Sequence, residues 1–234
     1  MASPEIGQRI LEIGAGPGNR LASLSRRGDV VAIDLVPSVV GQSVADGLNI
    51  EYRQMDAACL RFDTCSFDEV HAYDVLEHVE DIEKCLSEIS RVLKPNGIFR
   101  GEVPHPKSES WLLRQHPKYW QEVGHLRCFS SEVLRQYLGR AGLCLERIGT
   151  KNGAMSLQIA VLFALGGRVT GQRGELSNGN RWFNAGVAFF LDDVFRFPIH
   201  KWLFPIWVLT YPIGRVATLA MPKSIYFLAR KCGE

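Results

Sequence analysis

The sequence predicts an α/β fold with a mostly parallel sheet and helices on both of its faces. Across the first 150 residues, short apolar segments alternate with helical patterns, and turns rich in glycine or proline separate them. Strands that alternate with helices of about ten or more residues are typical of βαβ units, whose strands run parallel. The composition, 46% hydrophobic and 22% charged, excludes a disordered, collagen-like or coiled-coil protein.

Seven strands are expected, most of them short apolar segments that end at a turn or at an acidic residue. They cover residues 9–13, 29–34, 49–54, 67–73, 98–103, 143–149 and 224–230. Helices are expected over residues 19–27, from 37 onward, over 81–93 and over 130–141. The strongest of them carries Ile82, Cys85, Leu86 and Ile89 at spacings of three and four, and the segment 94–97 (Lys-Pro-Asn-Gly) ends it in a turn.

Residues 150–222 lack this alternation. They are apolar, are interrupted by four prolines (198, 205, 212 and 222), and are expected to form short helices. We therefore predict a core over residues 1–150, a helical insertion over 151–222, and a final core strand within 223–234.

The cysteines and the amino terminus indicate in which cellular compartment the protein is expected. Six cysteines stand at wide, irregular spacings without a C-x-x-C pair, so neither a zinc site nor a disulfide framework is expected, and reduced thiols are. Residues 1–8 lack the basic and apolar segments of a signal peptide. The expected location is cytoplasmic.

A glycine-rich turn follows the first strand. Gly14, Gly16 and Gly18 form G-x-G-x-G ahead of a helix, an arrangement that brings backbone N–H groups close to a ligand at the carboxyl edge of the sheet. Asn19 stands where the dinucleotide fingerprint G-x-G-x-x-G has its last glycine, which disfavours a nucleotide-dependent oxidoreductase.

Two acidic residues follow the next two strands. Asp34 can accept from both hydroxyls of a ribose, and Asp56 can accept from an exocyclic amine. Two plainer interpretations stay open: Asp34 as a helix cap or a solvated loop acid, and Asp56 as a turn residue.

These motifs together resemble class I S-adenosylmethionine-dependent methyltransferases, in particular the subgroup of ubiquinone and menaquinone methyltransferases. The resemblance covers about residues 8–150 and the last strand, and as a combination its motifs are specific. It rests on LEIGAGPGN (11–19), Asp34, MDA (55–57), FDEV (67–70), DVLEHV (74–79) and LKPNG (93–97). The fold that it implies is a Rossmann-like seven-stranded sheet.

The resemblance implies S-adenosyl-L-methionine as cofactor and S-adenosyl-L-homocysteine as product. Asp34 would bind the ribose, and Leu35 would lie against the adenine. Tyr73 and Asp74 would lie beside the sulfonium and the entering substrate. The methionine moiety would be held by Glu12, Gly14, Ala15, Gly16 and Gly18. The adenine would be held by Met55, Asp56 and Ala57. Acidic and aromatic neighbours suit a ligand that carries two positive charges.

Methyl transfer is an in-line displacement, and a hydroxyl acceptor also needs a general base. His78, His105 and His125 are the candidates, each with packing or capping as the alternative. No metal is expected as the main interpretation. Asp74, Glu77 and His78 nevertheless resemble the acidic-x-x-Glu-His element of ubiquinone-pathway O-methyltransferases, in which a divalent ion assists; the alternative is a solvated helix start.

The charge distribution sets the second part of the chain apart. Residues 151–234 carry ten basic and four acidic side chains, and aromatic residues gather from Trp182 onward. Three interpretations of this segment stay open: a cap over the active site, a peripheral membrane element over 182–222, and a homodimer interface. Its uncharged runs are shorter than the about 20 residues of a spanning helix. Nucleic-acid binding is not expected, because the basic residues are scattered.

The sequence thus predicts an enzyme that transfers a methyl group from S-adenosylmethionine to an oxygen or carbon of a small or lipid-linked acceptor. A nucleotide-dependent oxidoreductase and a non-catalytic cofactor-binding assembly protein are the alternatives.

Overall fold

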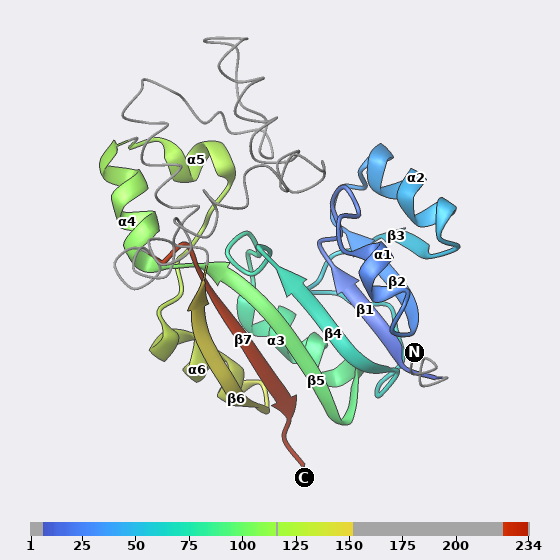
Figure 1. The fold of residues 1–234 in the computed structure, drawn as a ribbon. Coiled ribbons are helices and arrows are strands. Elements are labelled where there is room, and N and C mark those ends of the chain that lie inside the picture. The colour runs from blue at the N-terminus through green and yellow to red at the C-terminus, as the bar shows by residue number, and fades with distance from the viewer. Residues whose placement is uncertain (1–6, 116, 152–221, 234) are drawn as a thin grey trace, which may run out of the picture. The chain divides into compact units, whose positions relative to one another are not determined.

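The computed structural model describes residues 7–115, 117–151 and 222–233 (Figure 1). In chain order the elements are β1 (Arg9–Ile13), α1 (Leu21–Leu24), β2 (Asp29–Asp34), α2 (Val39–Gly47), β3 (Glu51–Gln54), β4 (Phe67–Tyr73), α3 (Ile82–Val92), β5 (Leu93–Pro104), α4 (Pro106–Gln115), α5 (Tyr119–Val123), α6 (Ser131–Arg140), β6 (Leu143–Lys151) and β7 (Ser224–Lys231). The chain divides into two compact units, Met1–Val103 with Leu126–Gly149 and Ile225–Glu234, and Pro104–His125 with Thr150–Ser224.

The strands form one seven-stranded sheet in the order β3-β2-β1-β4-β5-β7-β6. The pairs β1–β2, β1–β4, β2–β3 and β4–β5 are all parallel. β7 runs against its neighbours (Figure 1). The predicted α/β class with a mostly parallel sheet is therefore confirmed.

Two hydrophobic cores lie on opposite faces of the sheet, because successive side chains of a strand point to opposite sides. On β1, Leu11 and Ile13 belong to the larger core, together with buried residues of α3 and α6. Ile10 belongs to the smaller core, with Leu21 of α1 and Ala45 of α2. Helices therefore cover both faces, as the sequence predicts.

Helix starts follow the capping residues. Ser38, Asp81 and Ser130 each accept a hydrogen bond from a backbone N–H of the first turn of α2, α3 and α6. Each side chain satisfies a donor that has no partner within its helix. These three helices form where the sequence places them.

Three predicted elements differ in the structure. The helix over 19–27 is only the four-residue α1, the strand over 49–54 starts at Glu51, and the turn at 94–97 lies within β5. Leu93 pairs with Phe67 and Ile98 with Glu69, so the residues between them bulge out of a continuous ladder. Asn96 takes a left-handed conformation (φ 60°) in this bulge.

Two helices in the second unit, α4 and α5, were not expected from the sequence. The buried positions of α4 include Ser108 and Glu109, so the helix shows no apolar stripe at helical spacing. Buried hydrogen bonds take the place of that stripe. Glu109 accepts from Trp120 Nε1 at 2.6 Å, and the Ser108 hydroxyl donates to the carbonyl of Lys223 at 3.0 Å.

The expectation that all thiols are reduced is wrong. Cys144 at the start of β6 and Cys232 just after β7 form a disulfide with a Cα–Cα distance of 5.5 Å. Because the two cysteines are 88 residues apart, their local spacing in the sequence does not indicate this pairing. The other cysteines, Cys59, Cys65, Cys85 and Cys128, are not disulfide-bonded.

The helices, cap, membrane element and dimer interface expected from the sequence concern residues 152–221, which are not among the described residues. Within the described ranges, no helix combines the length and the apolar character needed to cross a membrane.

Candidate functional site

The turn after β1 is held by main-chain geometry. Gly14, Gly16 and Gly18 have φ values of 69°, 49° and 80°, a region that glycine enters at little cost. The N–H groups of Gly14 and Ala15 both donate to the carbonyl of Ile33 at the end of β2, at 2.8 and 3.1 Å. A Cβ on Gly16 would meet no atom of the described residues within 4 Å, so they leave open space beside the turn.

Asp34 joins this turn to the end of β2. Its Oδ2 accepts from the N–H of Gly16 at 2.9 Å, and its Oδ1 accepts from the N–H of Val36 at 3.0 Å. A carboxylate oxygen can accept more than one hydrogen bond. Leu35, next in the chain, is 63% exposed although its side chain is apolar.

The end of β3 supplies the next group of predicted residues. Met55 is buried, and its N–H donates to the carbonyl of Asp34 at 3.0 Å, so the two strand ends are in contact. Asp56 is exposed, and its Oδ1 accepts from the N–H of Ala58 at 2.8 Å. This bond shapes the turn after β3, and the role of Asp56 toward the adenine stays a prediction. Ala57 is buried beside it.

Glu12 is an acidic residue in a buried position. Its side chain is 2% exposed, and its Oε2 has no hydrogen-bond partner in the described part of the chain. Burial raises the pKa of Glu12 to about 7, although the Arg20 guanidinium 4.0 Å away acts in the opposite direction. A buried carboxylate oxygen without a donor is rare in native proteins. A ligand ammonium group would supply the missing donor.

Tyr73 and Asp74 end β4. The Arg20 guanidinium lies 3.8 Å from the centre of the Tyr73 ring, and burial raises the pKa of the Tyr73 hydroxyl. Asp74 is exposed and has φ 52°, and its N–H donates to the carbonyl of Glu102 at 2.9 Å. A non-glycine residue in this conformation is uncommon and occurs often at functional sites.

These residues fit the group that the motifs imply. The predicted contacts come from the carboxyl ends of β1, β2, β3 and β4, which are successive neighbours in the sheet (Figure 1). They offer a buried unsatisfied carboxylate, a second carboxylate, an exposed apolar side chain and open space beside a glycine turn. A ligand with an ammonium group, two ribose hydroxyls and an aromatic base matches that set.

The three candidate histidines have different surroundings. His78 is exposed, and its Nε2 lies 4.0 Å from Oε1 of the buried Glu77. In the second unit, His105 precedes α4 and its Nδ1 accepts from the N–H of Lys107, which makes it a helix cap. Burial lowers the pKa of His105.

His125 also belongs to the second unit. It is 8% exposed, its Nδ1 lies 2.9 Å from Oε2 of Glu109, and the rings of Tyr119 and Trp120 flank it. Which of the three histidines touches a reacting group remains a prediction, as does the metal set Asp74, Glu77 and His78.

Sequence reasoning missed a buried polar chain on β4. Glu69 and His71 are 4% and 1% exposed, and His71 Nε2 lies 2.9 Å from Glu69 Oε2. The Arg27 guanidinium bonds to both oxygens of Glu69 at 2.7 Å. The alternation Glu69-x-His71-x-Tyr73 in an otherwise apolar strand was the available signal.

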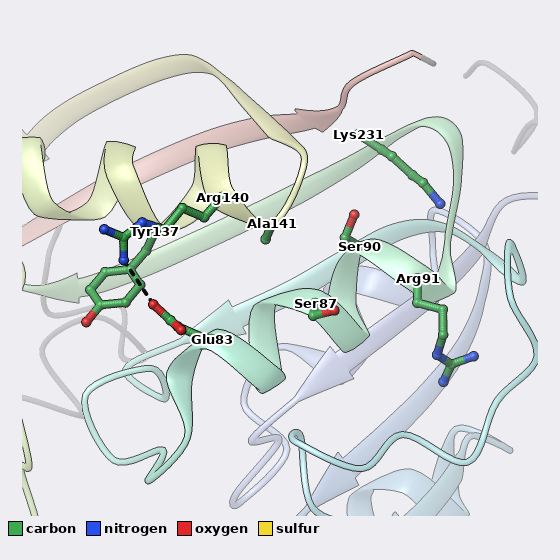
Figure 2. Close-up of a pocket in the computed structure, with 8 residues that line it drawn as sticks. All are labelled: Glu83, Ser87, Ser90, Arg91, Tyr137, Arg140, Ala141 and Lys231. Carbon is green, nitrogen blue, oxygen red and sulfur yellow. Dashed lines mark hydrogen bonds and ion pairs between the residues drawn. The ribbon is translucent and has the colours of Figure 1, made fainter.

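A cavity of about 390 Å³ lies between α3 and α6 and contains none of the predicted site residues. Figure 2 shows Glu83 and Arg140 paired at one end, and Arg91 and Lys231 at the other. Arg91 donates to the carbonyls of Phe62 and Leu60, and Lys231 donates to that of Leu93. These cations thus stabilise the fold. The cavity is lined by Glu83, Ser87, Ser90, Arg91, Tyr137, Arg140, Ala141 and Lys231.

Comparisons with known proteins agree with this geometry. Residues 11–100 match the family model described as a methyltransferase domain. A ubiquinone biosynthesis O-methyltransferase of Azorhizobium caulinodans is 42% identical over 101 residues, 41% of this chain and 40% of that protein. A demethylmenaquinone methyltransferase of Clavibacter sepedonicus is 39% identical over 99 residues, 41% of this chain and 40% of that protein. The chain thus spans about two-fifths of the curated relatives it matches.

Solved structures show the same fold at low identity. An S-adenosylmethionine dependent methyltransferase from Mesorhizobium loti superposes with a TM-score of 0.59 at 17% identity, covering 98% of this chain and 93% of that one. Phosphoethanolamine N-methyltransferase 2 of Haemonchus contortus, in complex with S-adenosyl-L-methionine, gives 0.60 at 20% identity and covers 97% and 49%.

The strand order, the glycine turn and the acidic strand ends define the class I methyltransferase fold. Within that class, the matched region resembles the ubiquinone and menaquinone methyltransferases, which confirms the resemblance that the motifs predicted.

Proposed function

We propose that this protein is an S-adenosylmethionine-dependent methyltransferase whose acceptor is a hydroxyl group on a small lipophilic molecule. The observation that carries the proposal is the buried Oε2 of Glu12, which lacks a donor in the described chain and lies on the strand that leads into the glycine turn. A cofactor with an ammonium group provides that donor.

The proposed cofactor contacts follow the predicted residues. Glu12 and the turn over 14–18 hold the methionine moiety, and the Asp34 carboxylate accepts from the ribose hydroxyls. The exposed Leu35 covers one face of the adenine, and residues 55–57 hold its edge. Tyr73 and Asp74 face the sulfonium and the acceptor. When bound, the cofactor supplies an electrophilic methyl group on a positive sulfur.

The acceptor class rests on the relatives. Matched relatives are named as enzymes of ubiquinone biosynthesis and as O-methyltransferases, which supports an oxygen nucleophile on a lipophilic ring. The basic and aromatic composition of residues 182–222 supports the same substrate class and a peripheral membrane contact. A hydroxyl that accepts a methyl group must lose a proton, so this acceptor also requires a base.

Calorimetric titration with S-adenosylmethionine and S-adenosylhomocysteine tests the cofactor assignment. Micromolar binding should be lost in Asp34→Ala and retained in Asp29→Ala, which removes an exposed carboxylate at the opposite end of the same strand. NADH serves as the probe for the oxidoreductase alternative. Failure of both methionine-derived ligands to bind, alone and with anionic liposomes present, would contradict the proposal; binding of NADH instead would support the alternative.

Liposome flotation tests the membrane contact. The full chain should float with vesicles that contain anionic lipid and should stay at the bottom with neutral ones, because the attraction depends on surface charge. A variant with Trp202 and Trp207 changed to Ala should float less. Equal sedimentation with both vesicle types would remove the membrane part of the proposal and leave the enzyme assignment in place.

A further inference from the structure

A continuous polar chain runs along one face of β4 toward the predicted reaction edge. Glu69, His71 and Tyr73 alternate along the strand and therefore point to the same side of the sheet. His71 Nε2 lies 2.9 Å from Glu69 Oε2, and His71 Nδ1 lies 3.3 Å from the Tyr73 hydroxyl oxygen. This series of hydrogen-bonded side chains ends at the phenol of Tyr73, a residue of the predicted cofactor site.

The charges around Glu69 determine the tautomer of His71. Burial alone would raise the pKa of Glu69, but hydrogen bonds from His71 and Arg27, with Arg100 nearby, lower it to about 2. An ionised carboxylate only accepts hydrogen bonds, so His71 Nε2 carries the proton. Nδ1 of a neutral imidazole is then an acceptor, and the Tyr73 hydroxyl donates to it.

The apolar residues at the neighbouring positions of β4 show that these three polar side chains are unusual in this strand. Val70 and Ala72, on the other face of the same strand, are fully buried apolar residues of the main core. A buried charged network contributes little net stability compared with apolar residues of similar volume, because desolvation of the charges offsets their attraction. Its presence under the cofactor edge therefore points to a role beyond packing.

We propose that Tyr73 takes the proton of the acceptor hydroxyl while it passes its own proton to His71, which Glu69 holds in place. Tyr73 is then the catalytic residue, and His71 and Glu69 are positioning residues that act through it. This inference rests on the proposed O-methyl transfer and deepens it, since it names the base.

The step balances in atoms and charge. The acceptor oxygen forms its bond to the methyl carbon as the bond from that carbon to sulfur breaks, and the bonding electron pair stays on sulfur. The acceptor proton moves to the Tyr73 oxygen, and the Tyr73 proton moves to His71 Nδ1. The resulting imidazolium lies against the Glu69 carboxylate. After the product leaves, the proton returns by the same path to solvent.

The environment sets the direction of the pH dependence. Burial lowers the pKa of His71 below 6.5, and Arg27 and Arg100 lower it further, against the opposing effect of Glu69. Across the sheet, Glu12 on β1 and Arg100 on β5 are the register partners of His71, and Glu102 is that of Tyr73. His71 is therefore neutral and able to accept a proton at pH 7. Activity should fall only at acidic pH, where the imidazole becomes protonated.

The first test reads the imidazole directly and needs no acceptor. Nitrogen NMR of the full chain with ¹⁵N-labelled histidine should show His71 at pH 7 as a neutral ring with Nε2 protonated. Tyr73→Phe should shift the Nδ1 resonance and leave the tautomer unchanged. A charged ring at pH 7, or protonation at Nδ1, would overturn the proposal.

The second test measures methyl transfer from S-adenosylmethionine to catechol as a function of pH. His71→Gln should lower kcat about 100-fold, the lower end of the range for general base catalysis. Glu69→Gln should lower it less, about tenfold, because Glu69 acts only through His71. Both should bind S-adenosylhomocysteine within about twofold of wild type, because neither residue touches the cofactor. The acid limb of the kcat profile should disappear in His71→Gln.

Asp68→Asn is the matched control. Asp68 lies on the same strand and pairs with Lys94 at 2.8 Å, outside the chain to Tyr73, so kcat should be unchanged. Loss of the acid limb in His125→Gln instead of His71→Gln would overturn the proposal and assign the base to the second unit. A wild-type protein that binds S-adenosylhomocysteine but does not methylate catechol would contradict the proposed acceptor, and the imidazole measurement would then decide the relay.

Discussion

The Asp34 carboxylate accepts a hydrogen bond of 2.9 Å from the N–H of Gly16, so the end of β2 holds the glycine turn that follows β1. The same carboxylate accepts from Val36 at 3.0 Å. One side chain thus shapes the turn, and it is also the residue predicted to bind the ribose.

Asp34→Asn should impair both of these roles. The amide oxygen can replace only one carboxylate oxygen, and the NH₂ group would then face an N–H donor. We expect a loss of about 1–2 kcal/mol in unfolding free energy and a loss of at least about tenfold in affinity for S-adenosylhomocysteine. Urea unfolding and calorimetry measure the two effects. Unchanged affinity would remove Asp34 from the cofactor site.

Gly14→Ala should destabilise the protein. Gly14 has φ 69°, and an added Cβ would lie 2.3 Å from Cγ2 of Val75. Strain and overlap together should cost about 2 kcal/mol or more, measured by urea unfolding, and Gly14→Ala combined with Val75→Ala should recover part of that loss. Gly47→Ala is the control, because its Cβ meets nothing within 4 Å at the end of α2. A stable Gly14→Ala protein would contradict the proposed geometry of the turn.

The sequence allowed prediction of elements with strong local signals. Alternating apolar strands and the caps Ser38, Asp81 and Ser130 predicted most of the sheet and three helices. Long-range partners could not be predicted in this way. In the sequence, Glu69 is a polar residue within an apolar strand. Only the structure shows that its counter-charge is Arg27, which lies 42 residues away in the sequence.

Polar burial accounts for one of the remaining misses, and long-range strand pairing accounts for another. α4 was missed because Glu109 and Ser108 are buried by hydrogen bonds, and a search for hydrophobic periodicity cannot detect such a helix. The turn at 94–97 was identified as a local feature, but only its pairing with β4 shows that it is a bulge inside β5.

Four of the six cysteines should react as thiols in denaturant without a reductant. Cys144 and Cys232 form a disulfide, and Cys59, Cys65, Cys85 and Cys128 are not disulfide-bonded. Mass spectrometry after alkylation should find the link between 144 and 232, and reduction should lower the unfolding free energy by about 2–4 kcal/mol. Six reactive thiols in protein purified under air would contradict this pairing.

Glu12→Gln should stabilise the ligand-free protein above neutral pH while weakening cofactor binding. Burial raises the pKa of Glu12 from 4.5 to about 7, so the folded state holds this proton more tightly than the unfolded chain. The associated stability is fully present below pH 4.5 and is lost as pH rises to about 7. The neutral amide avoids that loss, which is on the order of 3 kcal/mol for such a shift.

Urea unfolding of wild type and Glu12→Gln at pH 5 and pH 8 measures the effect. Glu69→Gln should behave in the opposite way, because hydrogen bonds from His71 and Arg27 outweigh burial and lower the pKa of Glu69 to about 2. Its stabilising contribution is present above pH 4.5 and is lost as pH falls toward 2, so this variant should be less stable than wild type at pH 8. A pH-independent difference between wild type and Glu12→Gln would show that Glu12 is not a strained carboxylate, and the argument that it awaits a cationic ligand would fail with it.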